Sequence, residues 1–166
     1  MEKFSIKKVI SGGQTGADLA GLKAAKQAFI TTGGTAPRKY KTEGGSNNDL
    51  KTVYNLTESH SEDYAVRTEA NIRGSHATLV FATNQFSPGT KLTISLCKKN
   101  NKRFVLIDPF SDTATENISE FIVQIFEFYK RDIILNIAGN RESKSPGIER
   151  KTEALLLELF SELTKK

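Results

Sequence analysis

Cysteine, histidine and tryptophan are nearly missing from this chain of 166 residues, which has one cysteine, two histidines and no tryptophan. A single thiol, Cys97, excludes an internal disulfide and any metal cluster built from cysteines, and we expect it to pack inside a helix. His60 and His76 stand far apart in the sequence, outside the spacing of metal ligands. The residue types therefore indicate no zinc or non-haem iron site.

Long hydrophobic runs are also missing. No apolar stretch approaches the roughly 18 residues that a membrane-spanning helix needs. Residues 1–5 lack the hydrophobic core of a signal peptide. We therefore expect a cytoplasmic protein with no membrane partner.

Sequence motifs for covalent catalysis are absent as well. The chain has no Gly-x-Ser-x-Gly elbow and no convincing Ser-His-Asp or Cys-His arrangement, which disfavours hydrolysis through a covalent intermediate. No Gly-Lys-Ser or Gly-Lys-Thr follows a glycine-rich turn, which disfavours ATP hydrolysis by a P-loop.

The composition is that of an ordinary globular protein. Hydrophobic residues make up 37% and charged residues 26% of the chain, which excludes a disordered, fibrous or membrane-embedded class. A length of 166 residues suits one hydrophobic core. We expect residues 1–166 to form a single ligand-binding domain.

A modest positive charge favours an anionic partner. The formal net charge is +5, from 24 lysines and arginines against 19 acidic residues. This balance suits a small anion without requiring nucleic acid, and the basic clusters lack the interleaved aromatic side chains that stack on exposed bases. We therefore expect a small anionic ligand and no nucleic acid.

Strand and helix patterns alternate along the chain. Short β-rich runs occupy residues 6–10, 53–56, 77–82, 103–107 and 133–137, with a sixth, short strand near 29–31. Helical patterns occupy residues 15–29, 62–73, 90–100, 116–129 and 147–164. Most strands lack the alternation of a half-exposed strand, so they should be buried on both faces. The order predicts an α/β fold, doubly wound and Rossmann-like, with a mostly parallel sheet and helices on both faces.

The turn after the first expected strand is rich in glycine and leads into a helix. It contains Gly12, Gly13, Gln14, Thr15 and Gly16. Free backbone N–H groups at a helix start can bind an anion, and glycines allow close approach. A glycine-rich turn that only packs a strand against a helix is the alternative. Asp18, at the top of the helix, either orients a ligand donor or only favours the helix terminus electrostatically.

Two further turns carry similar features. One joins Gly34 to the cations Arg38 and Lys41, of which Arg38 is the better candidate for a phosphate or oxo contact. The other contains Ser87, Gly89 and Thr90 at the start of a helix, where the backbone can bind phosphate and Thr90 can act as a cap.

Two other segments complete the candidate site. Tyr64, Arg67, Thr68 and Asn71 share one helix face, which is polar where a core face would be apolar. That face could line a site, or Arg67 could only form surface ion pairs. The loop at 138–147, which contains Ser143 and Lys144, again follows a strand, so several loops should meet at one edge of the sheet.

Five segments in order, ISGGQTGADLAGL, GGTAPRKYKTEGG, DYAVRTEANIRGSHATLVF, SPGTKLTISL and LNIAGNRESKSPGI, cover nearly the whole chain. Together they resemble the molybdenum cofactor carrier family, a branch of the SLOG group of Rossmann-like nucleotide-binding folds. The resemblance implies a non-catalytic carrier that binds and protects the molybdenum cofactor (molybdopterin) or molybdate through phosphate and oxo groups. A molybdoenzyme recipient and a homo-oligomer are expected with it.

A nucleotide or an ADP-ribose-like molecule, bound or processed as by other SLOG proteins, is the alternative ligand. In phosphoribohydrolases that resemble this fold, an acidic residue stands three positions after the Gly-Thr pair, and Thr93 stands there in this chain. Glycosidic cleavage by that route is therefore disfavoured.

Overall fold

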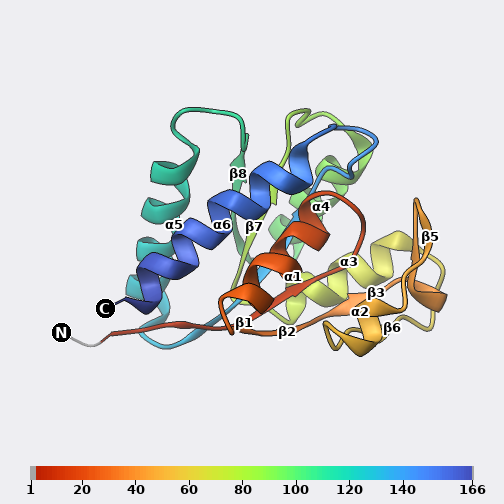
Figure 1. Ribbon diagram of the computed structural model, residues 1–166, viewed down its shortest axis with the longest axis horizontal. Coiled ribbons are helices and arrows are strands. Elements are labelled where there is room, and N and C mark those ends of the chain that lie inside the picture. Colours follow the sequence, from red (N-terminus) through yellow and green to blue (C-terminus); the bar gives the residue numbers. More distant parts are fainter. Residues whose placement is uncertain (1–2, 166) are drawn as a thin grey trace.

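The centre of the molecule is a parallel β-sheet of five strands (Figure 1), in a computed structural model that describes residues 3–165. The order across the sheet is β2-β1-β9-β7-β8, and all neighbouring strands run parallel. The strands are β1 (Ile6–Ser11), β2 (Thr31–Gly33), β7 (Ala77–Phe81), β8 (Arg103–Ile107) and β9 (Ile133–Gly139).

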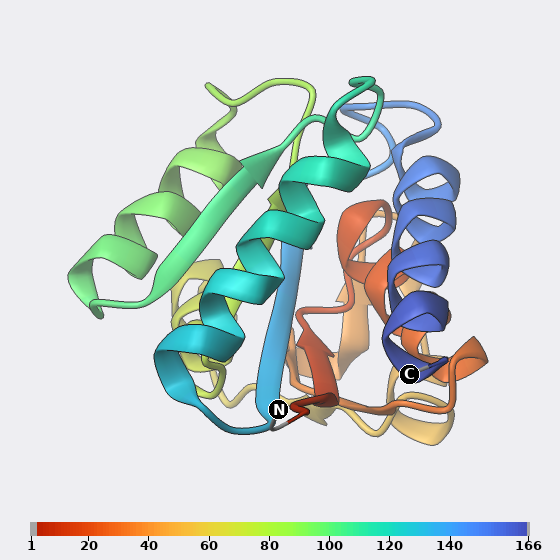
Figure 2. The ribbon, with the colours of Figure 1, turned by 90° about the vertical axis from the view of Figure 1, so that its left-hand side faces the viewer.

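Helices cover both faces of this sheet (Figures 1 and 2). One face carries α1 (Ala17–Gln27), α5 (Ala114–Tyr129) and α6 (Ile148–Thr164), and the other carries α3 (Tyr64–Arg73) and α4 (Pro88–Lys99). The predicted Rossmann-like α/β class is therefore confirmed. Within residues 3–165, no helix is long and apolar enough to span a bilayer.

Small elements fill the segment between β2 and α3. These are β3 (Thr35–Ala36), the 3-10 helix η1 (Arg38–Tyr40), β4 (Lys41–Thr42), β5 (Gly45–Ser46), α2 (Asp49–Thr52) and β6 (Thr57–Glu58). Strand β3 pairs in parallel with β6, and β4 pairs with β5 as an antiparallel hairpin. The segment therefore forms an arm beside the main sheet, and its Ala36, Leu50 and Leu56 share a small core with Leu22 of α1.

The strand order has a simple relation to the common dinucleotide-binding order 3-2-1-4-5. If the strands are counted from β9 and continue through β1, β2, β7 and β8, the observed order becomes 3-2-1-4-5. The start of β1 and the end of α6 lie at the same end of the molecule in both views, as such a rearrangement requires (Figures 1 and 2). The sheet is thus a circularly permuted Rossmann sheet, with the last strand of the chain at its centre.

Two of the strand predictions differ from the structure. Residues 53–56 form no strand of the described chain, because Asn55 adopts a left-handed backbone conformation (φ 61°) that breaks an extended segment. The short strand predicted near 29–31 begins two residues later, at Thr31. Phe29, also left-handed (φ 59°), ends the preceding helical segment and is almost fully exposed.

The main core lies between the sheet and the helices α1, α5 and α6. The closing helix α6 contributes Ile148, Leu156, Leu159 and Phe160, which are buried there. Cys97 packs in α4 on the opposite face, as expected, and burial raises the pKa of its thiol. Both faces of the sheet are therefore filled by helix side chains, which leaves the strand ends as the place for a site.

Replacing Phe160 by alanine should destabilise the protein strongly. The side chain is fully buried, and loss of such a side chain costs about 3–5 kcal/mol of unfolding free energy. Phe29→Ala is the matched control, since Phe29 is 98% exposed. Urea denaturation should separate the two variants clearly, and equal midpoints for both would contradict this description of the core.

Candidate functional site

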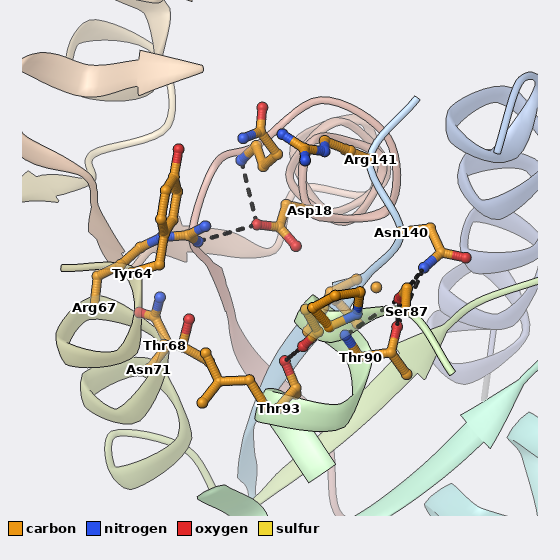
Figure 3. Close-up of a pocket in the computed structure, with 18 of the residues that line it drawn as sticks. Asp18, Tyr64, Arg67, Thr68, Asn71, Ser87, Thr90, Thr93, Asn140 and Arg141 are labelled. Carbon is orange, nitrogen blue, oxygen red and sulfur yellow. Dashed lines mark hydrogen bonds and ion pairs between the residues drawn. The ribbon is translucent and has the colours of Figure 1, made fainter. Parts of the chain in front are cut away.

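A cavity of about 300 Å³ opens at the carboxyl ends of β1, β9 and β7. Its walls come from the turn after β1, one face of α3, the start of α4 and the segment 136–144 (Figure 3). This volume is at the lower end of the range for small-molecule sites, and ligands of doubly wound sheets bind at such strand ends. The position and size define a site for a small ligand.

The polar face of α3 forms one wall. Tyr64, Arg67, Thr68 and Asn71 all line the cavity, as their spacing predicted. The amide of Asn71 is engaged, however: Oδ1 accepts from the Thr35 N–H (2.8 Å) and Nδ2 donates to the Thr35 carbonyl (3.0 Å). Asn71 therefore holds the arm against α3, whereas Arg67 reaches the middle of the site.

A partly buried ion pair lies at the end of β1. Arg67 Nη1 is 3.4 Å from Asp18 Oδ2, which also accepts the Gln14 N–H at 3.2 Å. Burial raises the pKa of Asp18, although the charge of Arg67 opposes that shift. A Cβ atom on Gly12 would lie 1.5 Å from Arg67 Nη1, so only glycine lets the guanidinium lie over this turn. Arg67 is thus a cavity residue, not part of a surface ion pair.

The start of α4 forms the opposite wall. The Ser87 hydroxyl accepts the Thr90 N–H (3.4 Å) and donates to Thr90 Oγ1 (2.9 Å), which caps the helix. The first-turn N–H of Gly89 has no hydrogen-bond partner among the described residues. A Cβ atom on Gly89 would meet nothing within 4 Å, so the space beside this N–H is open. This end of the helix is a free donor site that attracts anions.

Asn140, just after β9, links the walls of the site. Its Oδ1 accepts the Thr83 N–H (3.0 Å) and the Asn84 N–H (3.3 Å), and its Nδ2 donates to Ser87 Oγ and Thr90 Oγ1, both at 3.1 Å. The backbone carbonyl of Asn140 also accepts the N–H of the first residue of α1 at 3.1 Å. One side chain therefore positions the start of α4 relative to the central strand.

The glycine-rich turn after β1 uses part of its backbone within the protein. Two of its N–H groups have acceptors there: Gly13 donates to Ser11 Oγ (3.2 Å) and Thr15 donates to Gln14 Oε1 (3.0 Å). Gly13 also faces the arm, where a Cβ atom would lie 2.7 Å from Leu50. Gly13 and Thr15 therefore offer no free N–H to an anion, because neighbouring side chains already accept their protons.

Glu43, at the tip of the β4–β5 hairpin, clamps the arm onto the sheet. Its carboxylate accepts hydrogen bonds from the Thr15 hydroxyl and from the hydroxyl and N–H of Ser143, and lies 3.7 Å from Arg141 Nε. Burial alone would raise the pKa of Glu43, but the hydrogen bonds from Ser143 and Thr15 together lower it. The hydroxyl groups of Thr15 and Ser143 therefore bind the carboxylate of Glu43 and hold the arm in place.

The candidate residues chosen from the sequence divide into two groups. Those that line the cavity are Gly12, Gln14, Asp18, Arg67, Asn71, Ser87, Gly89, Thr90 and Lys144. Those outside its lining are Gly13, Thr15, Gly16, Gly34, Arg38, Lys41 and Ser143. Arg38 and Lys41 are exposed on the arm. At Gly16, an added Cβ atom would lie 2.4 Å from the backbone carbonyl oxygen of Asn140. At Gly34, an added Cβ atom would collide with the backbone of Ser11.

Among the cavity residues missing from the sequence-based set, three carry an amide or a charge. Asn140 and Arg141 follow β9 directly, so their place at a strand end was readable from the sequence. Asn136 lies inside β9, and the only available sign was an amide in an otherwise apolar strand. Its inward orientation depends on the register with β1 and β7, which the sequence did not reveal.

The charge around the cavity is positive. Among the described lining residues, Arg67, Arg141 and Lys144 are cationic, and Asp18 is the one carboxylate. Because Asp18 is already paired with Arg67, and Arg141 lies 3.7 Å from Glu43, Lys144 is the lining cation that these ion pairs do not involve. Such an arrangement favours an anionic group next to the free N–H of Gly89.

A permuted Rossmann sheet with a cationic cavity at its strand ends defines a Rossmann-like protein that binds a small ligand. The chain belongs to the circularly permuted YpsA family of SLOG proteins, whose model matches residues 9–160. The family description agrees with the strand order.

A solved structure of similar fold comes from Syntrophus aciditrophicus and is named "putative molybdenum carrier protein". It shares 36% sequence identity with this chain, covers 96% of it and 97% of its own length, and superimposes with a TM-score of 0.82. No protein of curated function matches the chain significantly.

We expect Asn140→Ala to loosen the site and destabilise the fold. The change leaves two N–H groups and two hydroxyls without their partner, at a cost of about 2–4 kcal/mol in unfolding free energy. Asn117→Ala, on the exposed surface of α5, should change stability by less than about 0.5 kcal/mol. Chemical denaturation measures both, and a wild-type midpoint for Asn140→Ala would refute the linking role.

The Glu43 clamp should open in acid. Because the folded pKa of Glu43 lies below its ordinary value of 4.5, its stabilising contribution is present above pH 4.5 and is lost as the pH falls through the folded pKa. Amides of the β4–β5 hairpin should then exchange hydrogen faster. In Glu43→Ala they should exchange fast already at pH 7, while amides of β9 stay protected. Unchanged hairpin exchange in that variant would exclude the clamp.

Proposed function

We propose that the chain binds the molybdenum cofactor in this cavity and carries it unchanged, with the phosphate of the ligand at the start of α4. The observation that carries the proposal is the free N–H of Gly89 in open space, at a cavity whose lining also includes the cations Arg141 and Lys144. A phosphate there would accept from the helix terminus and be attracted by both cations. The similar solved structure is named a molybdenum carrier, which supports a ligand that contains molybdenum.

The donor set of the cavity suits a complete cofactor better than a bare metal ion. Among the described residues there is no group of three or more histidine, cysteine or acidic side chains that could hold a metal. The cofactor's own dithiolene holds molybdenum, so this chain needs to supply only anion, ring and oxo contacts. A cavity of about 300 Å³ also exceeds the space that a single oxyanion such as molybdate needs.

Carriage without chemical change is supported by the polar groups of the cavity. The carboxylate of Asp18 is held by Arg67 and by the Gln14 N–H, so it is not free to act on a ligand. Thr93, where the similar phosphoribohydrolases have an acid, donates its hydroxyl proton to the Gly89 carbonyl (3.0 Å). A carrier of this kind would deliver the ligand to a molybdoenzyme in the cytoplasm, and we propose that it does so as a homo-oligomer.

Gly89→Asp should weaken ligand binding without harming the fold. The new carboxylate enters open space beside the proposed phosphate position, and an acidic residue in the first turn suits a helix. Loss of a charge-assisted contact corresponds to roughly a tenfold to hundredfold increase in Kd. Gly44→Asp is the matched control: it makes the same charge change at an exposed glycine with room for a side chain, outside the cavity lining.

The measurement is reconstitution of a cofactor-free molybdoenzyme after timed storage of the cofactor with each protein. Wild type and Gly44→Asp should preserve the cofactor longer than buffer alone, and Gly89→Asp should not. Equal protection by all three proteins would place the ligand elsewhere. Release of base or sugar from nucleoside monophosphates or ADP-ribose by the wild type would instead support a nucleotide-processing enzyme.

A further inference from the structure

Two buried polar atoms of the cavity residues have no hydrogen-bond partner among the described residues: Asn136 Oδ1 and Arg67 Nε. Asn136 is only 2% exposed and the Arg67 side chain 11%. A buried polar atom without a partner costs about 1–3 kcal/mol, so native proteins rarely keep one without a role. Both atoms belong to residues that line the proposed ligand site.

The Asn136 amide is fixed at its other end. Nδ2 donates to Thr78 Oγ1 on the neighbouring strand β7 at 3.2 Å, which leaves Oδ1 as the free acceptor. Thr78 and Asn136 stand at paired positions of the neighbouring strands β7 and β9. The acceptor is therefore held in one place before any ligand binds.

Arg67 is fixed as well. Nη1 is paired with Asp18, and Cζ lies 5.3 Å from the centre of the Tyr64 ring. The guanidinium lies over Gly12, two residues after Ile10, which is paired in register with Asn136. Arg67 and Asn136 line the same cavity, so one ligand can contact both residues.

We propose that Asn136 Oδ1 and Arg67 Nε recognise the head group of the ligand: an uncharged heterocycle that presents a hydrogen-bond donor beside an acceptor. The donor would pair with Asn136 and the acceptor with Arg67. Leu92, Ile137 and Tyr64 line the same cavity and offer apolar contact to the ring. Because Asp18 already pairs with Arg67, no unpaired carboxylate of the described cavity lining awaits a cationic head group. The assignment rests on the proposed binding of an anionic ligand in this cavity and adds the recognition of its other end.

The test compares three phosphates that share one anionic end. Inosine 5′-monophosphate carries an N–H beside a carbonyl on its ring, purine riboside 5′-monophosphate has the same ring without that pair, and ribose 5-phosphate has no ring. The wild type should bind the inosine compound at least about tenfold more tightly than the purine riboside compound in calorimetry, because only the first pairs both buried atoms.

Two variants then separate the head group from the phosphate. Asn136→Leu should remove the preference for inosine 5′-monophosphate and leave ribose 5-phosphate affinity unchanged. Arg67→Lys keeps the charge beside Asp18 but lacks Nε, and should reduce the preference in the same way. Gly89→Asp should weaken all three ligands equally, because it acts on the phosphate.

The outcomes distinguish this assignment from the proposed function. Equal affinity of the wild type for the two purine compounds, with both weakened by Gly89→Asp, would overturn head-group recognition and leave the anion site intact. A preference that persists in Asn136→Leu would overturn the role of Asn136. No binding of any of the three phosphates at millimolar concentration would contradict the anion site and this assignment with it.

Discussion

The site depends on the hydrogen bonds of one buried amide at the end of the central strand. Asn140 holds the start of α4 through Ser87 and Thr90, holds the loop after β7 through two N–H groups, and accepts an N–H from α1 with its backbone carbonyl. It can do so because β9 lies between β1 and β7. The permuted strand order thus brings three separate segments of the chain to one residue.

The distribution of charges follows from which polar groups are already paired. Asp18 and Arg67 neutralise one another inside the cavity, and such pairs contribute more to orientation than to stability. Glu43 engages Thr15 and Ser143 on the outer side, which joins the arm to the main sheet. Gly89 keeps a free donor at the start of α4, and Lys144 adds a cation to the lining of the same cavity. These two residues favour anion binding at α4.

Much of the fold could be predicted from local patterns. Buried strands such as β8 and helices such as α6 have strong, uninterrupted periodicity, and their positions agree with the structure to within about two residues. The strand predicted at residues 53–56 was wrong because Leu56, like Leu50, packs in the small core of the arm and does not belong to a sheet strand. Short apolar runs have this ambiguity, since burial of any kind selects the same residue types.

The sequence by itself determined the class of fold, the glycine and polar residues of the strand ends, and the polar face of α3. Each of these depends on neighbours close in the chain, such as helix periodicity, caps and turns. Only the tertiary structure decided which N–H groups are free, that Thr15 and Ser143 meet at Glu43, and that Asn136 faces the cavity. The physical reason is that hydrogen-bond satisfaction and burial depend on strand order and register, which bring together residues more than 100 positions apart.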